Sequence, residues 1–198
     1  MTDLTRRRLL QLMSTAPLAA GFVWTATEVV DAAERSRAVR QTGTPYTPQF
    51  FTAHEYATVV LLADLIIPAD DRSGSASDAG VPEFIDFMMI DQPSRQIPVR
   101  GGLAWVDQEC TSRFGQPFVK ATDAERHQVL DEISGLEPAR PDQSHGVAFF
   151  RAFRDLTATG FWTSKMGIDD LQFMGNTLVA EWKGCPPEAL AKLGLDAE

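Results

Sequence analysis

The sequence is short of the residues that hold cofactors. It has three histidines and two cysteines among 198 residues, and none of them stands in an HExxH, CxxC or CxxCH pattern. These patterns supply the closely spaced ligands of zinc, iron–sulfur and c-type haem sites. No GxGxxG or P-loop glycine motif is present either, so the sequence predicts no nucleotide site. We therefore expect this chain to carry no metal and no cofactor of its own.

Patterns of a catalytic site are missing as well. No GxSxG elbow presents a nucleophilic serine. The acid pairs Asp70-Asp71 and Asp169-Asp170 are adjacent, which is typical of solvated turns and helix caps rather than of acid–base catalysis. The sequence therefore predicts a protein that is not an enzyme. A Ser-His-Asp triad is assembled from residues far apart in sequence, so an exported enzyme with a site that no motif reveals is an alternative.

Basic residues are outnumbered by acidic ones. The 18 Lys and Arg against 27 Asp and Glu give a net charge of −9. An acidic protein is repelled by phosphate backbones and by anionic lipid headgroups. We therefore expect neither nucleic acid nor an anionic membrane surface as a direct partner. The hydrophobic content of 44 % is typical of a globular domain with its own core.

No stretch alternates polar and apolar residues as a half-buried β-strand requires. Apolar residues recur instead at helical spacing, and Thr52–Glu55 and Thr122–Glu125 match the capping box that opens a helix. The sequence predicts an all-α fold, a single compact domain of about six helices over residues 50–198. The expected helices cover 52–67, 82–91, 99–114, 122–134, 146–159 and 187–193. The first is apolar nearly all round, which favours a central, buried position.

The chain has one long uncharged run, and it directly follows basic residues. Arg6-Arg7-Arg8 precedes a run without charge from Leu9 to Thr27. A basic stretch, a weakly apolar run and an arginine pair are typical of an export signal read by the twin-arginine translocase, with Arg6 and Arg7 as the pair. We predict a signal segment over 1–33, a linker over 34–49 and export to the periplasm.

The sequence leaves the fate of this segment open. About 20 apolar residues span a bilayer, so an uncleaved membrane tether is an alternative, although Pro17 and Gly21 make the run a poor anchor. The nearest candidate cleavage site, Asp31-Ala32-Ala33, matches A-x-A imperfectly, and a further alternative is that the chain to about Arg40 persists as a helix. The twin-arginine route carries folded proteins, often with a cofactor inside, yet no cofactor motif follows the signal.

The two cysteines, Cys110 and Cys185, form an even pair in a chain that we expect to be exported. Such a pair predicts one disulfide. A bridge over so long a loop would stabilise the fold by on the order of 4 kcal/mol. Helical spacing places Cys110 on the inner side of its helix. The alternative is two unrelated thiols.

Aromatic residues gather in the last third of the chain. Adjacent rings such as Phe161 and Trp162 do not both face a core, and exposed aromatic side chains commonly mark protein interfaces. We therefore predict a partner interface around one turn and near the C-terminus: Phe161, Trp162, Ser164, Lys165, Met166 and Trp182. The alternative is that these rings fill the core.

Five segments follow one another along the chain: FTAHEYATVVLLADLIIPADD, GVPEFIDFMM, ECTSRFGQPF, GFWTSKMGIDDLQFMGN and EWKGCPPEALAKLGL. The pieces LIIP, TSKMG and WKGCPP are the most specific in this order. With them, the chain resembles the gluconate 2-dehydrogenase subunit 3 family over about residues 50–195.

The resemblance implies a small, helical, non-catalytic subunit. Members bind a large FAD-containing oxidoreductase of the glucose–methanol–choline type that has no signal of its own, and they act as its export escort and maturation factor. The FAD belongs to that partner, which oxidises a sugar, a sugar acid or a glycoside in the periplasm. Electrons often pass on to a multihaem cytochrome c subunit. A signal shared with such a partner would explain why no cofactor motif follows Arg6-Arg7.

Overall fold

The computed structural model describes residues 25–41, 43, 45–134, 143–173, 175, 181 and 184–194. All regular elements in this part of the chain are helices, which confirms the predicted all-α class. They are α2 (Ala26–Gln41), α3 (Ala53–Ile66), α4 (Val81–Asp91), α5 (Pro93–Phe114), the 3₁₀ turn η1 (Phe118–Lys120), α6 (Asp123–Ile133), α7 (Ser144–Thr163), α8 (Lys165–Asp170) and α9 (Pro187–Lys192). Arg6, Arg7 and Trp182 lie outside the described residues. None of the described helices combines the length and the apolar character needed to cross a bilayer.

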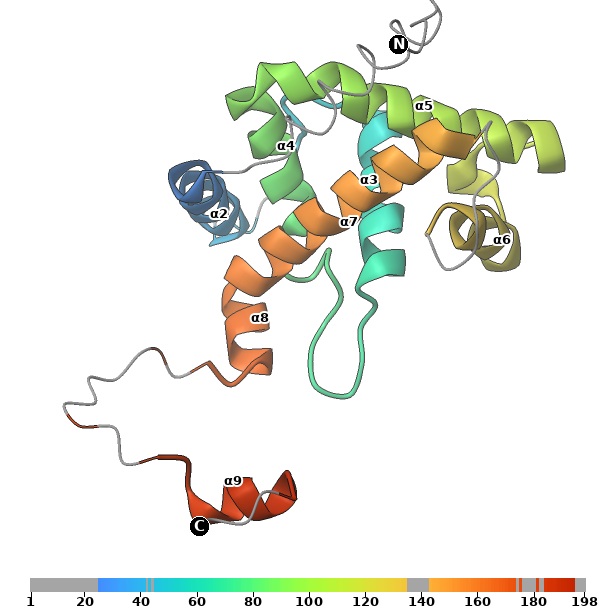
Figure 1. Cartoon of the computed structure of the whole chain (residues 1–198). Helices are drawn as coiled ribbons and strands as arrows, with labels where there is room; N and C mark the ends of the chain where they lie inside the picture. The colour runs from blue at the N-terminus through green and yellow to red at the C-terminus, as the bar shows by residue number, and fades with distance from the viewer. Residues whose placement is uncertain are drawn as a thin grey trace, which may run out of the picture.

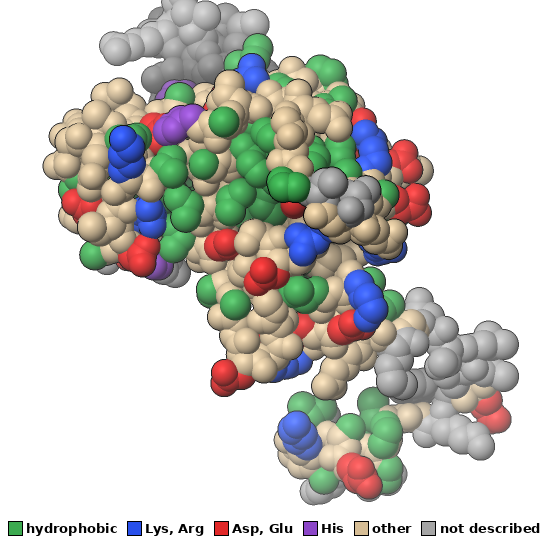
Figure 2. Space-filling view, turned by 180° about the vertical axis from the view of Figure 1, so that it is seen from behind, with side chains coloured by type: hydrophobic (Ala, Val, Ile, Leu, Met, Phe, Trp, Pro, Cys, Tyr) green, Lys and Arg blue, Asp and Glu red, His purple; other side chains and the backbone are tan. Residues whose placement is uncertain are grey.

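Helix α4 lies at the centre of the structure. Helices α2, α3, α5 and α7 all contact it, and in Figure 1 it stands between α2 and α3 and behind α7. Eight of its eleven residues are buried, so the expectation that α3 is the central helix is wrong. Only four of the fourteen residues of α3 are fully buried. Other apolar residues of α3, among them Leu61 and Leu65, are partly buried against the core. Figure 2 shows apolar side chains gathered near the middle of the back of the molecule.

A buried carboxylate on α4 fastens the segment that leads into α3. Asp86 is 0 % exposed. Its Oδ2 accepts hydrogen bonds from the Tyr46 hydroxyl at 2.6 Å and the Gln49 amide at 2.7 Å. Its Oδ1 accepts from the amides of Phe50 and Phe51 at 3.1 and 3.0 Å. Burial, together with this neighbouring carboxylate, raises the pKa of Tyr46, which keeps the phenol a donor. One side chain therefore sets the path of residues 46–51 against α4.

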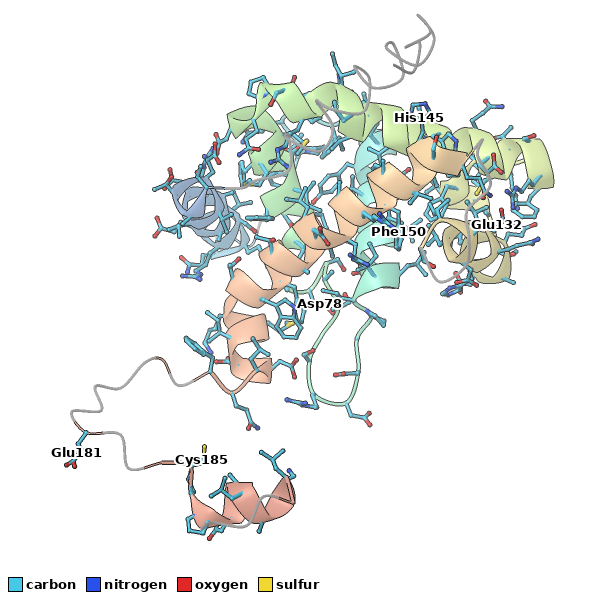
Figure 3. All side chains as sticks on the ribbon, in the orientation of Figure 1. Asp78, Glu132, His145, Phe150, Glu181 and Cys185 are labelled. Atoms are coloured by element: carbon cyan, nitrogen blue, oxygen red, sulfur yellow. The ribbon has the colours of Figure 1, made fainter. Side chains whose placement is uncertain are left out.

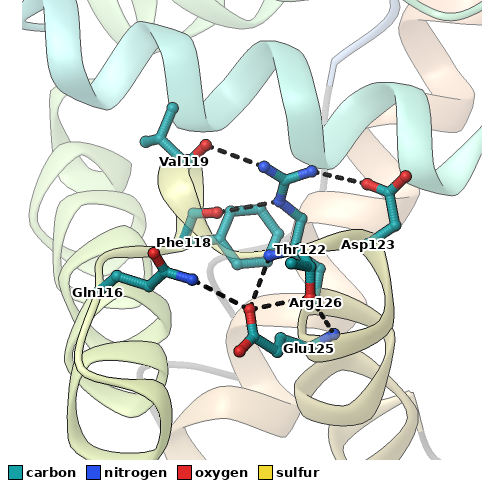
Figure 4. Close-up of polar contacts among 7 residues, drawn as sticks. All are labelled: Gln116, Phe118, Val119, Thr122, Asp123, Glu125 and Arg126. Atoms are coloured by element: carbon teal, nitrogen blue, oxygen red, sulfur yellow. Dashed lines mark hydrogen bonds and ion pairs between the residues drawn. The ribbon is translucent and has the colours of Figure 1, made fainter.

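Both predicted capping boxes are confirmed. Thr52 and Thr122 each accept from the backbone amide three residues on, and Glu55 and Glu125 reach back to the cap amides. Around the second box, Arg126 donates to the carbonyls of Phe118 and Val119 at 3.0 and 2.9 Å, as Figure 4 shows. The start of α6 is thereby tied to η1.

Two helices are longer than their sequence patterns indicate. α5 begins at Pro93 instead of the expected Val99 and continues through Pro98. Pro98 has no backbone N–H, so the helix lacks one hydrogen bond at that position. α7 runs to Thr163, past the expected end at residue 159, because Gly160 is buried against Phe84 and does not end the helix.

The predicted disulfide is absent, and both cysteines are free. Cys110 is buried on the inner side of α5, as its spacing indicated, and burial raises the pKa of its thiol to about 11. Cys185 is exposed beside α9, and Figure 3 shows it well away from α5. Because a disulfide requires Cα atoms within about 7 Å of each other, these positions do not allow the bridge, and the prediction is wrong for this structure.

Helix α2 occupies much of the expected linker. The sequence predicts a linker over 34–49, but residues 34–41 continue a helix that begins at Ala26 and packs on α4 and α7. Ala32 and Ser36 are buried in this contact. The residues of α2 that make this contact have small side chains, and many charged residues stand between them in the sequence. The helical spacing of its apolar residues is therefore hard to recognise from the sequence.

We expect Asp86→Asn to lower the free energy of unfolding by on the order of 3 kcal/mol. The amide removes the negative charge from four donors and turns a donor of its own toward some of them. Urea unfolding followed by circular dichroism measures the change. Asp155→Asn on α7 is the matched control, because Asp155 is exposed and forms an exposed ion pair with its neighbour Arg154. Equal stability of the two variants would contradict the role of Asp86.

Candidate functional site

Groups that could do chemistry are scattered over the described residues. No three His, Cys, Asp or Glu side chains gather there in a way that could hold a metal ion. His54 is exposed and pairs with Asp107, and the other two histidines are exposed on α6 and α7. Asp70 accepts hydrogen bonds from the amides of Arg72 and Ser73 at 2.8 Å, so it shapes a turn.

The end of α7 and the residues after α8 expose large apolar side chains. Trp162 is 39 % exposed, Leu171 57 % and Phe173 61 %. We call these three residues the α8 surface. Exposed aromatic and large aliphatic side chains cost free energy in water, and they are typical of a surface that a partner covers.

The turn between α7 and α8 is tightly built. Ser164 Oγ donates to the Phe161 carbonyl at 2.7 Å and accepts from the Gly167 amide at 3.0 Å, so it caps α8. A Cβ on Gly167 would lie 2.1 Å from the Phe161 carbonyl oxygen. Serine and glycine three residues apart therefore let α8 begin with only Ser164 between it and the end of α7. These contacts explain the TSKMG piece of the sequence in physical terms.

The predicted interface residues divide between core and surface. Trp162 and Lys165 are exposed, whereas Met166 is half-buried against the core. Phe161 is 1 % exposed and packs edge-to-face under Trp162, with ring centroids 4.9 Å apart. The prediction that Phe161 faces a partner does not agree with this position, which matches the alternative of a core ring. Trp182 lies outside the described residues, so its role stays a prediction.

A cleft of about 850 Å³ adjoins this turn. One wall is the C-terminal half of α2, the second is the loop between α3 and α4, which carries the labelled Asp78 in Figure 3, and the third is α8. Its charged lining residues are Arg37, Arg40, Arg72, Asp78, Lys165, Asp169 and Asp170. Two ion pairs hold its rim: Arg72 with Asp170 at 3.2 Å, and Lys165 with Asp169.

Sequence reasoning missed this cleft because one wall lies in the predicted linker. A signal existed in the spacing of Val29, Ala32, Ala33 and Ser36, which all fall on one side of a helix. Their small size hid the pattern. Which loop and which turn face them is decided by contacts between segments far apart in the sequence.

Comparison with known proteins supplies the family. The family model for gluconate 2-dehydrogenase subunit 3 matches residues 53–182, more than half of the chain. The chain belongs to the gluconate 2-dehydrogenase subunit 3 family. The matched range begins at the first residue of α3 and includes the α7–α8 turn. Searches of curated proteins and of solved structures returned no match. Family membership makes the chain a relative of a dehydrogenase subunit, which agrees with an accessory role and with a surface for other subunits.

We expect Gly167→Ala to lower the free energy of unfolding by roughly 2 kcal/mol, because the new methyl group collides with backbone that has little room to move. Gly101→Ala is the control, since a Cβ at exposed Gly101 in α5 meets nothing within 4 Å. That change should leave the protein as stable or raise its stability by about 0.5–1 kcal/mol. Chemical denaturation of the two variants side by side measures both effects, and a neutral Gly167→Ala would refute the close approach.

Proposed function

We propose that this chain is the non-catalytic small subunit of a periplasmic FAD-dependent dehydrogenase complex that oxidises a sugar, a sugar acid or a glycoside. Its task is to escort a signal-less catalytic subunit of the glucose–methanol–choline type through the twin-arginine translocase and to support the maturation and stability of that subunit. The FAD belongs to the catalytic subunit, and a multihaem cytochrome c subunit is a further candidate member. The observation that carries the proposal is the family match over 53–182.

The arginine pair supports the escort role. Arg6-Arg7 precedes an uncharged run, and the twin-arginine route serves proteins that fold before export. The sequence after the signal contains no cofactor motif of its own, so the folded cofactor protein that needs this route is the partner. The small subunit then supplies the export signal, and its helical domain binds the catalytic subunit.

The α8 surface is the part of the described chain that best fits a binding surface for the catalytic subunit. It combines Trp162, Leu171 and Phe173, and interfaces owe most of their affinity to a few large side chains of this kind. Hydrogen bonds fix the backbone that carries these side chains: Ser164 caps α8, and the amides of Leu171 and Phe173 donate to carbonyls of α8 at 3.0 and 3.1 Å. Preorganisation of this kind reduces the entropy lost on association.

We expect a Leu171→Ala, Phe173→Ala double variant to bind the catalytic subunit at least about thirtyfold more weakly, as the loss of an interface hot spot does. Co-purification from the periplasm, followed by a titration of the purified subunits, measures the affinity. Ile97→Ala is the control, because Ile97 is a large apolar side chain of α5 that is 83 % exposed, and Figure 1 shows α5 at the top of the domain and α8 below it. Unchanged affinity in the double variant would show that the catalytic subunit binds a different surface of this chain. The proposed escort role would not be affected by that result.

The escort role itself is tested at the arginine pair. Arg6→Lys with Arg7→Lys should leave the flavin-dependent dehydrogenase activity in the cytoplasm, because the catalytic subunit has no other address. Cell fractionation with an activity assay and an FAD fluorescence measurement locates the enzyme. Arg8→Lys, the neighbouring arginine outside the pair, is the matched control and should export normally. Periplasmic activity in the double variant would show that the escort role is wrong.

A further inference from the structure

Helix α2 is held on the domain by specific contacts. Ser36 Oγ donates to the Gly80 carbonyl at 2.7 Å, and Arg40 donates to the Ser77 carbonyl at 2.7 Å. Arg35 pairs with Asp91 and lies over the Phe87 ring, 5.4 Å from its centroid. These bonds join α2, whose first residues fall within the predicted signal segment, to α4 and to the loop before α4.

The residues that α2 contacts, Ser77, Gly80, Phe87 and Asp91, form a surface that we call its seat. Several parts of the fold contribute to it. Gly80 has a φ of +85°, and a Cβ there would lie 2.7 Å from Arg40 Cδ and 2.8 Å from Ser36 Oγ. The loop that carries Gly80 is itself held by Asp64 of α3, which accepts from the Ser77 amide and hydroxyl at 2.7 and 2.8 Å. The seat therefore exists only when α3, the loop and α4 are in place.

Away from this seat, α2 has little reason to be helical. It is 16 residues long and rich in charge, and isolated helices of this length are marginal in water. Its stability comes from the tertiary contact that buries Ala32 and Ser36. We therefore expect α2 to lose its helical structure when it detaches from the rest of the domain.

We propose that α2 belongs to the mature protein and is a docking helix that couples the N-terminal segment to the folded domain. Docked, it protects the chain over Ala26–Gln41 from proteolytic processing, including the site Asp31-Ala32-Ala33 that the sequence offers. Proteases cut exposed, extended backbone, whereas Ala32 is buried in the middle of a docked helix. The proposal rests on the proposed function only in treating the segment before α2 as an export address, because the docking contacts stand by themselves.

A matched pair of variants on α2 tests the docking in the full-length chain. Ala32→Gln and Ala38→Gln make the same chemical change on the same helix, but only Ala32 is buried. Limited trypsin digestion with mass spectrometry measures cutting after Arg35 and Arg37. We expect Ala32→Gln to speed these cuts by roughly tenfold or more, since opening of α2 controls them, and Ala38→Gln to leave the rate as in the parent chain. Equal rates in the two variants would overturn the proposal.

The seat gives a second test if Ala32→Gln unfolds the whole domain. Gly80→Ala strains a left-handed backbone and also pushes α2 away, whereas Gly115→Ala strains a similar backbone, with φ of +75°, and meets nothing within 4 Å. Faster cutting within α2 only in Gly80→Ala supports docking, and equal cutting in both overturns it.

The mature N-terminus completes the experiment. Intact-mass measurement of the chain recovered from the periplasm should show Ala26–Gln41 retained, and a mature chain that begins at Glu34 would refute the proposal. A chain that fails to reach the periplasm while α2 stays protected from trypsin would instead count against the proposed export role and leave the docking in place.

Discussion

The buried carboxylate of Asp86 is the constraint on which the rest of the fold depends. Placing a carboxylate in the core is costly unless donors surround it, and here one hydroxyl and three amides do so. Satisfying Asp86 brings residues 46–51 against α4 and so fixes where α3 begins. Because α2, α3, α5 and α7 all contact α4, the position of Asp86 links the segment before α3 to the centre of the helical domain.

Small residues decide how closely the outer helices approach this centre. Gly160 lets Phe84 of α4 enter the surface of α7, and Gly80 does the same for α2. At the α7–α8 turn, Gly167 lets the start of α8 pack directly against the backbone at the end of α7. The base of the α8 surface thus depends on a backbone contact that a larger side chain would prevent.

The cleft lies between the two regions with a proposed role. Its walls include α2, which begins within the predicted signal segment, and α8, which lies between Trp162 and the exposed Leu171 and Phe173 along the chain. The proposed partner surface therefore adjoins a cleft with α2 on one wall. Family membership agrees with an accessory role for the chain.

The sequence by itself determined the features that depend on neighbouring residues. These are the all-α class, both capping boxes, the inward position of Cys110 and the family motifs, because helix propensity and caps act within one turn. Tertiary structure decided the rest. Whether Phe161 or Trp162 faces the core depends on which helices pass beside them, since neighbouring residues point about 100° apart on a helix. The same holds for the separation of Cys110 from Cys185 and for α2, whose small buried side chains become a docking face only when Gly80 and α4 lie opposite them.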